Sequence, residues 1–134
     1  CHYMPPGRYA DADPALIAEV RRRTDGLSVP VHTGPSWTTD APFRETESLI
    51  ASRRLEGIIS VEMEAAALLT LGKALNKPVV CFAHVTNTMA TRTDDFEKGG
   101  DAGLAGSLSV CAAALEAALE HGEGKTNTGR RGTR

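Results

Sequence analysis

One short segment, residues 57–67, constrains the fold of this chain more than any other. Its sequence, Gly-Ile-Ile-Ser-Val-Glu-Met-Glu-Ala-Ala-Ala, passes from an apolar run through two carboxylates into an alanine-rich stretch. The apolar run is typical of a buried strand, and the alanines favour a helix. Carboxylates in the first turn of a helix are stabilised by the helix dipole. The segment therefore predicts a strand-to-helix junction with Glu62 and Glu64 at the turn.

The rest of the chain continues this alternation of strands and helices. Asp13-Pro14 is typical of a helix start and Gly26 of a helix end, because Asp caps free N–H groups and glycine accepts the backbone turn that follows. Helices are also expected over residues 45–52, 63–75 and 104–119, and strands over residues 27–32, 55–61 and 79–85. Strands that alternate with helices predict an α/β fold with a largely parallel central sheet.

Three polar segments follow the expected strands, namely residues 33–44, 62–64 and 86–89. In open α/β sheets, ligands bind at the carboxyl ends of the strands. We therefore expect these three segments to come together at one binding site.

The composition excludes several classes of protein. The chain has 134 residues, which suits one domain, and its formal net charge of -2 gives no general attraction to nucleic acid or to an anionic membrane. No apolar stretch approaches the ~18 residues of a membrane span. The three arginines at residues 21–23 are interpreted as the solvated face of a helix. Residues 122–134 are polar and without periodicity, and are predicted to be a disordered basic tail.

The cysteine, histidine and glycine patterns carry no signature of a metal or a dinucleotide. The three cysteines form no C-x-x-C pair, and Cys81 and Cys111 lie in apolar runs that are typical of buried thiols. These features favour a reduced, cytoplasmic setting. The His and Cys spacing predicts no metal site, and the lack of a Gly-rich fingerprint predicts no dinucleotide cofactor.

Three sequence blocks together resemble the nucleoside phosphorylase family, the superfamily of purine nucleoside and uridine phosphorylases. Val-Glu-Met-Glu-Ala-Ala at residues 61–66 looks like the ribose-binding signature of that family. Residues 36–46 and 82–89 look like the two blocks that hold the base, and the three blocks occur in the family's order. The resemblance covers about residues 1–120 and corresponds to the C-terminal half of the family's domain.

That resemblance implies a three-layer-type α/β fold with a mainly parallel or mixed central sheet, here incomplete and occupying residues 1–121. The other half of the family's domain carries the glycine and the arginines that hold phosphate, and we find no such loop in this sequence. The chain also opens with Cys1 and not with Met. We therefore expect a fragment or truncated product that has no phosphate ligands of its own.

The resemblance also assigns the ribose site. It implies that Glu64 holds the ribose hydroxyls, that Met63 packs on the sugar and that Glu62 also lines the pocket. A carboxylate suits this role, because it can accept from both neighbouring hydroxyls and hydrogen bonds to a charged acceptor are strong. The alternative is that both glutamates are merely exposed at a helix N-terminus.

Trp37, the only tryptophan, matches the base-stacking aromatic of the family and stands in a polar loop. Stacking of an indole on a nucleobase contributes roughly 1–3 kcal/mol. The alternative is a tryptophan that pins the loop by packing. Within the same loop Thr38 is expected to shape the backbone, and Arg44 to form a structural ion pair with Asp40 or Glu45.

Thr86 and Asn87 are expected beside the base, at the end of the most apolar strand. The position of Asn87 resembles that of an aspartic acid that protonates the purine ring in the purine branch. Asn forms hydrogen bonds but cannot act as a general acid. Pyrimidine members of the family lack this acid, so Asn87 favours a uridine-type substrate.

The activity that the resemblance implies is reversible phosphorolysis of a nucleoside to its base and ribose-1-phosphate, as in nucleoside salvage. Phosphate is the co-substrate, no other cofactor is expected, and the complete protein is expected to be a homo-oligomer. Two alternatives stay open. One is a hydrolytic nucleosidase, which shares the fold and the Glu-Met-Glu signature but also uses the acid that Asn87 replaces. The other is an inactive fragment that serves only as a binding or oligomerisation module.

Overall fold

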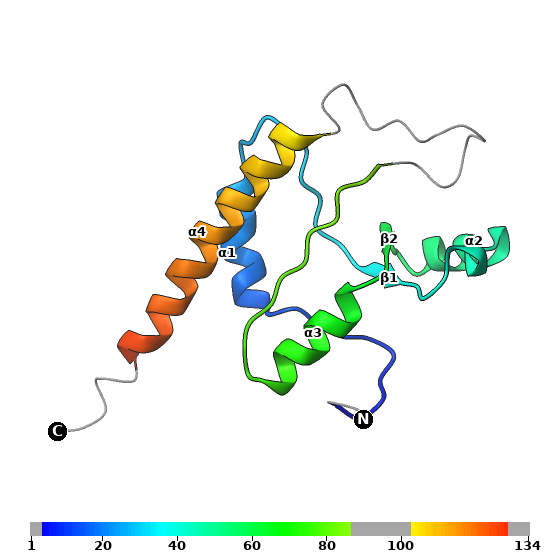
Figure 1. The fold of residues 1–134 in the computed structure, drawn as a ribbon, viewed down its shortest axis with the longest axis horizontal. Coiled ribbons are helices and arrows are strands. Elements are labelled where there is room, and N and C mark those ends of the chain that lie inside the picture. The colour runs from blue at the N-terminus through cyan, green and yellow to red at the C-terminus, as the bar shows by residue number, and fades with distance from the viewer. Residues whose placement is uncertain (1–3, 87–102, 129–134) are drawn as a thin grey trace.

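The computed structural model describes residues 4–86 and 103–128, with side chains as far as Gly122 (Figure 1). The elements, in chain order, are α1 (Pro14–Thr24), β1 (Ser36–Thr38), the 3-10 helix η1 (Pro42–Arg44), α2 (Glu47–Leu55), β2 (Ser60–Glu62), α3 (Ala65–Ala74) and α4 (Leu104–Thr128). Within the described residues, β1 and β2 form a parallel two-stranded sheet. The predicted α/β class is confirmed.

The elements gather in two groups. α1 and α4 lie side by side, while α2, α3 and the small sheet lie together on the other side of the molecule (Figure 1). The extended stretches 27–35 and 78–86 run between the two groups (Figure 1). Each stretch also contacts the helix pair, since Val80 packs on its core and Val29 lies so close to Gly106 that a side chain there would collide with it.

Local sequence explains α1 directly. Asp13 caps the helix, because its Oδ1 accepts hydrogen bonds from the N–H groups of Ala15 and Leu16 at 2.9 Å each. Pro14 occupies the first turn, where its missing N–H costs nothing. Gly26 follows the helix with a φ of 87°, a conformation that favours glycine. The predicted start and end of this helix are confirmed.

The α1–α4 contact contains the best-buried apolar side chains of the described residues. Leu16 and Val20 of α1 meet Ala117 of α4, which is 0% exposed, and Ala113 of α4 is also buried. Small alanine side chains let the two helices approach closely. The core therefore depends on tight backbone approach more than on large side chains.

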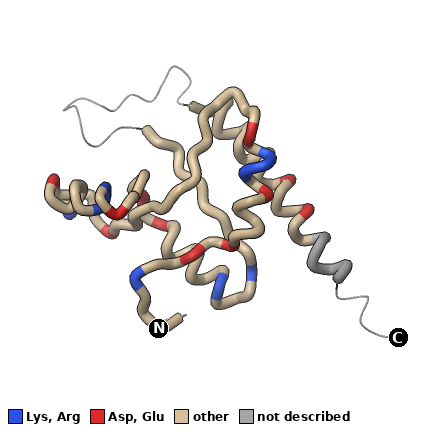
Figure 2. Tube along the Cα trace, turned by 180° about the vertical axis from the view of Figure 1, so that it is seen from behind, with Lys and Arg blue, Asp and Glu red and all other residues tan. Residues whose placement is uncertain are grey.

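Ion pairs reinforce this contact at the end of α1. The Arg23 guanidinium binds Glu116 of α4 at 2.7 Å, Glu19 at 3.2 Å, and also Glu120 of α4. Oppositely charged stretches of the two helices accordingly lie beside each other in Figure 2. Glu120 and Glu19 raise the pKa of Arg23, while hydrogen bonds from the arginines hold the pKa of Glu19 below its usual range. The interpretation of residues 21–23 as a solvated face is therefore wrong for Arg23, which belongs to the helix interface.

The strands differ most from the sequence prediction. The stretches 27–32 and 79–85 are extended but join no sheet among the described residues, and the predicted strand over 55–61 is reduced to β2. β1 lies instead inside the predicted loop 33–44. A strand requires a partner for its N–H and C=O groups, and apolar composition alone cannot supply one. β1 has that partner in β2, with Trp37 opposite Val61 and Thr38 opposite Glu62.

The helices agree better with the prediction. α2 and α3 begin two residues after their expected starts, and α2 ends three residues later and α3 one residue earlier than expected. α4 continues to Thr128, past the point at residue 122 where a disordered tail was expected to begin. No helix in the described parts of the chain is both long and apolar enough to cross a membrane.

One face of α4 leaves a row of leucines uncovered. Leu104, Leu108, Leu115 and Leu119 recur at intervals of four or seven residues along the helix, and they are between 60% and 62% exposed. The periodicity is confirmed as helical, but in the described structure α1 packs against the alanine side of α4.

A larger residue at the centre of the α1–α4 contact should destabilise the fold. We expect Ala117→Leu to lower the free energy of unfolding by about 1–3 kcal/mol, because an overpacked core must displace Leu16 or Val20. Ala118→Leu, the same change at the exposed neighbouring position, should stay within about 0.5 kcal/mol of the unmodified chain. Urea unfolding followed by circular dichroism measures both, and equal effects would contradict this account of the core.

Candidate functional site

The predicted strand-to-helix junction is present. Glu62 is the last residue of β2, Met63 and Glu64 form the turn, and α3 begins at Ala65. Such a turn exposes the free N–H groups of the first helical turn, which need acceptors. Glu64 stands at the N-cap position, yet its side chain forms no capping hydrogen bond. The acceptors for these N–H groups are therefore supplied by another side chain.

The Glu62 carboxylate supplies them. Its Oε2 accepts from the N–H groups of Glu64 at 2.8 Å and Ala65 at 2.5 Å. Its Oε1 accepts from the hydroxyl of Ser36 at 3.2 Å and from the hydroxyl of Thr38. Both oxygens are therefore engaged by the protein itself, which joins the end of β2 to β1 and to the start of α3.

The electrostatics of Glu62 follow from these contacts. Its partial burial acts against ionisation, but the hydrogen bonds from the Thr38 hydroxyl and the two backbone N–H groups outweigh burial and hold the pKa of this carboxyl below its usual range. Glu62 is thus an ionised anchor at neutral pH. The alternative in which both glutamates are merely exposed at a helix N-terminus is therefore wrong for Glu62.

Glu64 has a different environment. Its side chain is exposed, and the hydrogen bond that the structure gives its carboxylate comes from the neighbouring N–H of Met63 at 3.2 Å. Met63 is also exposed, at 47%. A carboxylate and a thioether side chain thus stand open beside each other at the carboxyl end of β2. The arrangement suits a ligand that offers hydroxyl donors and an apolar face.

Trp37 lies on β1, one residue from the contacts to Glu62, and is half-buried. The Arg53 guanidinium of α2 lies over its ring, 5.5 Å from the ring centre, as in a cation–π contact. Trp37 was expected in a loop and is instead held by sheet pairing. The parallel register brings it to the same small sheet as Glu62, so the structure does place the predicted aromatic and the Glu-Met-Glu turn on adjoining strands.

The third predicted block is only partly described. Thr86 is exposed at the end of the extended stretch 78–86, and Asn87 lies outside the described residues. His84, on the same stretch, has an exposed side chain. Its ring lies so close to Gly103 that no side chain would fit there.

The expected pair of Arg44 with Asp40 is confirmed, with 3.6 Å between the charged groups.

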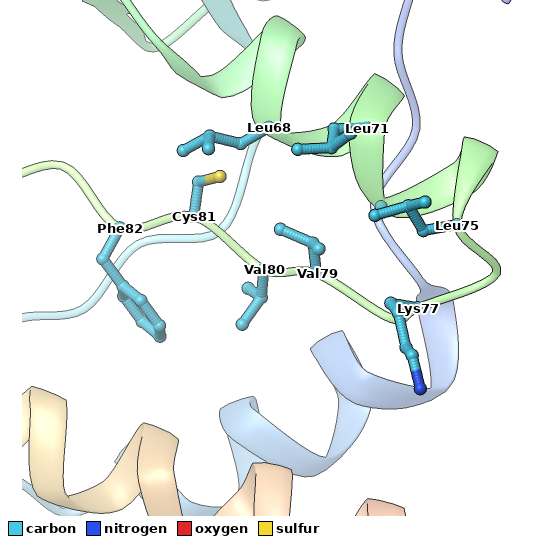
Figure 3. A pocket seen from close by; sticks show the side chains of 9 residues that line it. Leu68, Leu71, Leu75, Lys77, Val79, Val80, Cys81 and Phe82 are labelled. Atoms are coloured by element: carbon cyan, nitrogen blue, oxygen red, sulfur yellow. The ribbon is translucent and has the colours of Figure 1, made fainter. Parts of the chain in front are cut away.

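A hollow of about 420 Å³ lies between α3 and residues 79–82 (Figure 3). Leu68 and Leu71 of α3 and Leu75 at its C-cap line one side, and the side chains of Val79 and Cys81 point toward them, while Val80 and Phe82 point to the other side of the chain (Figure 3). The lining is mostly apolar, so the hollow offers few groups that could bind a sugar. Cys81 lies at this hollow. Burial raises the pKa of the Cys81 thiol, and the charge of Glu62 adds to the effect, so the thiol stays protonated at neutral pH. This hollow contains none of the predicted ribose or base ligands.

Sequence reasoning missed the role of Ser36 and Thr38. Residues two apart on a strand project from the same face, so the Ser-Trp-Thr pattern places both hydroxyls on one side and Trp37 on the other. That alternation was a usable signal, had residues 36–38 been predicted to be a strand. Among the described residues, no cluster of His, Cys, Asp and Glu could hold a metal ion.

A family model described as the phosphorylase superfamily matches residues 1–120 of the chain. Searches among curated proteins and among solved structures found no significant match.

The Glu62 carboxylate should make stability depend on pH. Because its pKa is lowered in the folded state, its contribution is present above the ordinary value of 4.5 and is lost as the pH falls through the folded-state pKa. We expect Glu62→Gln to lower the free energy of unfolding at pH 7 and the difference from the unmodified chain to shrink below about pH 4. Ser36→Ala, which removes one of the partners, should show the same trend with a smaller difference. A difference that does not change with pH would contradict the assignment.

Proposed function

The chain belongs to the phosphorylase superfamily, and from this premise we propose that it binds a nucleoside at the junction of β2 and α3. The proposed reaction is reversible phosphorolysis of a uridine-type nucleoside to the free base and ribose-1-phosphate. The observation that carries the proposal is the contrast between the two carboxylates of the turn. Glu62 is fully engaged by protein groups, while the Glu64 carboxylate beside it is exposed.

In the proposed complex, Glu64 accepts hydrogen bonds from the 2′- and 3′-hydroxyls of the ribose. Charge-assisted hydrogen bonds of this kind are strong and orient the sugar. Met63 supplies a soft apolar wall for the ribose face. Positive charge develops on the sugar as the base departs, so a fixed carboxylate beside the ring also lowers the barrier electrostatically.

Trp37 is proposed to stack on the base. Arg53 lies over the indole ring, so the base is expected on the opposite face of the ring or in place of the guanidinium. Thr86 and Asn87 are proposed to hydrogen-bond the base. Because Asn87 cannot donate a proton as an acid, the proposal favours a uracil leaving group, which hydrogen bonds alone can stabilise.

The proposal assigns no phosphate ligand to this chain. Phosphate, the co-substrate, is expected to be held by residues of another part of the protein or of a neighbouring subunit in a homo-oligomer. No further cofactor, no nucleic acid and no membrane is part of the proposal. A reduced, cytoplasmic setting is proposed as well, supported by Cys81 and Cys111, which are free thiols.

The products released from uridine test the reaction. We expect the natural full-length protein, given uridine and inorganic phosphate, to release uracil and ribose-1-phosphate. Free ribose in place of ribose-1-phosphate would establish the hydrolytic nucleosidase, and no release of uracil would favour a binding or oligomerisation module. Inosine should react more slowly than uridine, because general acid catalysis contributes about 10²- to 10⁴-fold and Asn87 cannot provide it.

Asn87→Asp is the matched variant for this assay. The new carboxyl should raise the rate with inosine selectively and leave the rate with uridine little changed. Equal changes with both substrates, or a preference of the unmodified enzyme for inosine, would contradict the argument from the missing acid.

Replacement of the exposed carboxylate tests the ribose site. We expect Glu64→Gln to weaken uridine binding by about 10- to 100-fold, because hydrogen bonds to a charged acceptor contribute roughly 1.5–3 kcal/mol. Glu47→Gln, which removes an exposed carboxylate from α2, serves as the control and should leave binding unchanged. Calorimetric titration with uridine gives both affinities, and an effect of Glu64→Gln below about threefold would remove this residue from the site.

A further inference from the structure

A continuous hydrogen-bond network connects β1, β2 and the first turn of α3. The Thr38 hydroxyl donates its proton to Glu62 Oε1 and accepts the N–H of Ala66 at 3.0 Å. Glu62 Oε2 accepts the N–H groups of Glu64 and Ala65. Three consecutive backbone N–H groups at the start of α3 therefore have acceptors, and both acceptors depend on the contact between Thr38 and Glu62.

The network lies between the two groups that the proposed function assigns to ligand. Thr38 directly follows Trp37, and its backbone is paired in register with Glu62. Thr39 adds a further tie, because its N–H donates to the Glu62 carbonyl at 2.9 Å. At the other end of the network, Glu64 is anchored through its own N–H. The backbone next to Trp37 and the backbone of Glu64 are thus held by one set of bonds.

Neither Thr38 nor Glu62 is itself available to a nucleoside. Both oxygens of the Glu62 carboxylate already accept two hydrogen bonds each, and the Thr38 hydroxyl uses its single proton and one lone pair within the network. Residues two apart on β1 share a face, so the Trp37 side chain projects from the face opposite to the Ser36 and Thr38 hydroxyls. A change to the network would reach the ligand only through Trp37 and Glu64.

We propose that Thr38 and Glu62 are positioning residues that fix the distance between the base-stacking Trp37 and the ribose-binding Glu64. This inference rests on the proposed function. It changes the role that the family resemblance gives to Glu62, from a residue that lines the pocket to one that positions Trp37 and Glu64 relative to each other. Loss of the Thr38 hydroxyl should displace Trp37 in the free protein, before any ligand is added.

The sole tryptophan of the chain supplies the readout. Thr38→Val keeps the shape of the side chain and removes its donor and acceptor, while Thr38→Ser keeps both. We expect Thr38→Val to shift the emission maximum of Trp37 and to increase its quenching by acrylamide, and to weaken uridine binding roughly tenfold, the size of one lost hydrogen bond. Thr38→Ser should restore both values, and Thr33→Val, the same change at an exposed threonine, should alter neither.

The two readouts separate the positioning role from the proposed function. Unchanged Trp37 emission in Thr38→Val overturns the positioning role, even if uridine affinity falls, because only a direct contact with the ligand would act in that way. A shifted emission with no uridine binding by the unmodified protein overturns the proposed function, and the network is then purely structural. If Thr38→Val does not fold by circular dichroism, Ser36→Ala, which loses the longer 3.2 Å bond to Glu62, should still shift the emission by a smaller amount. Unchanged emission in folded Ser36→Ala would then overturn the proposal.

Discussion

The carboxylate of Glu62 is the contact on which the small sheet depends. β1 and β2 are three residues each, and parallel pairing of such short strands provides few backbone hydrogen bonds. A two-stranded sheet is marginal by itself in water. Glu62 adds four side-chain hydrogen bonds that connect both strands to the start of α3. The side chains of Met63 and Glu64 can therefore stay open to a ligand, because the Glu62 carboxylate already accepts hydrogen bonds from the backbone N–H groups of Glu64 and Ala65.

The features that local chemistry determines were predictable from the sequence. Asp13, Pro14 and Gly26 define the ends of α1, and the change from an apolar run to alanines places the junction at Glu62–Glu64. The strands were less predictable, because pairing depends on a partner distant in the sequence. Residues 27–32 were predicted to be a strand, yet it is Trp37 and its neighbours that have β2 beside them. Composition describes how well a residue suits a strand but not which stretch will find a partner.

For the candidate site, the sequence likewise predicted the local feature, the strand-to-helix junction, but not the contacts that depend on distant residues. The difference in role between Glu62 and Glu64 could not be read from two identical side chains in one motif. It arises because Ser36 and Thr38, more than 20 residues earlier, project toward one carboxylate and not the other, with 24 residues separating Thr38 from Glu62. The effect of Glu62 on the Cys81 thiol is likewise a property of the folded chain. Local sequence identified the strand-to-helix junction, and tertiary contacts determine the environment of each carboxylate.

The contact between α1 and α4 carries a different consequence, which concerns the order of assembly. Arg23 and Glu116 are 93 residues apart, whereas the strand contact between Thr38 and Glu62 spans 24. Joining distant parts of a chain costs entropy that grows with the logarithm of the loop length, by about 0.6 kcal/mol for each doubling. The sheet and α3 form a short-range unit, and the helix pair closes the longest loop of the described chain. Contact order thus favours early formation of the β1–β2–α3 unit, and a few residues inserted between α3 and α4 would add little to the cost of closing the loop.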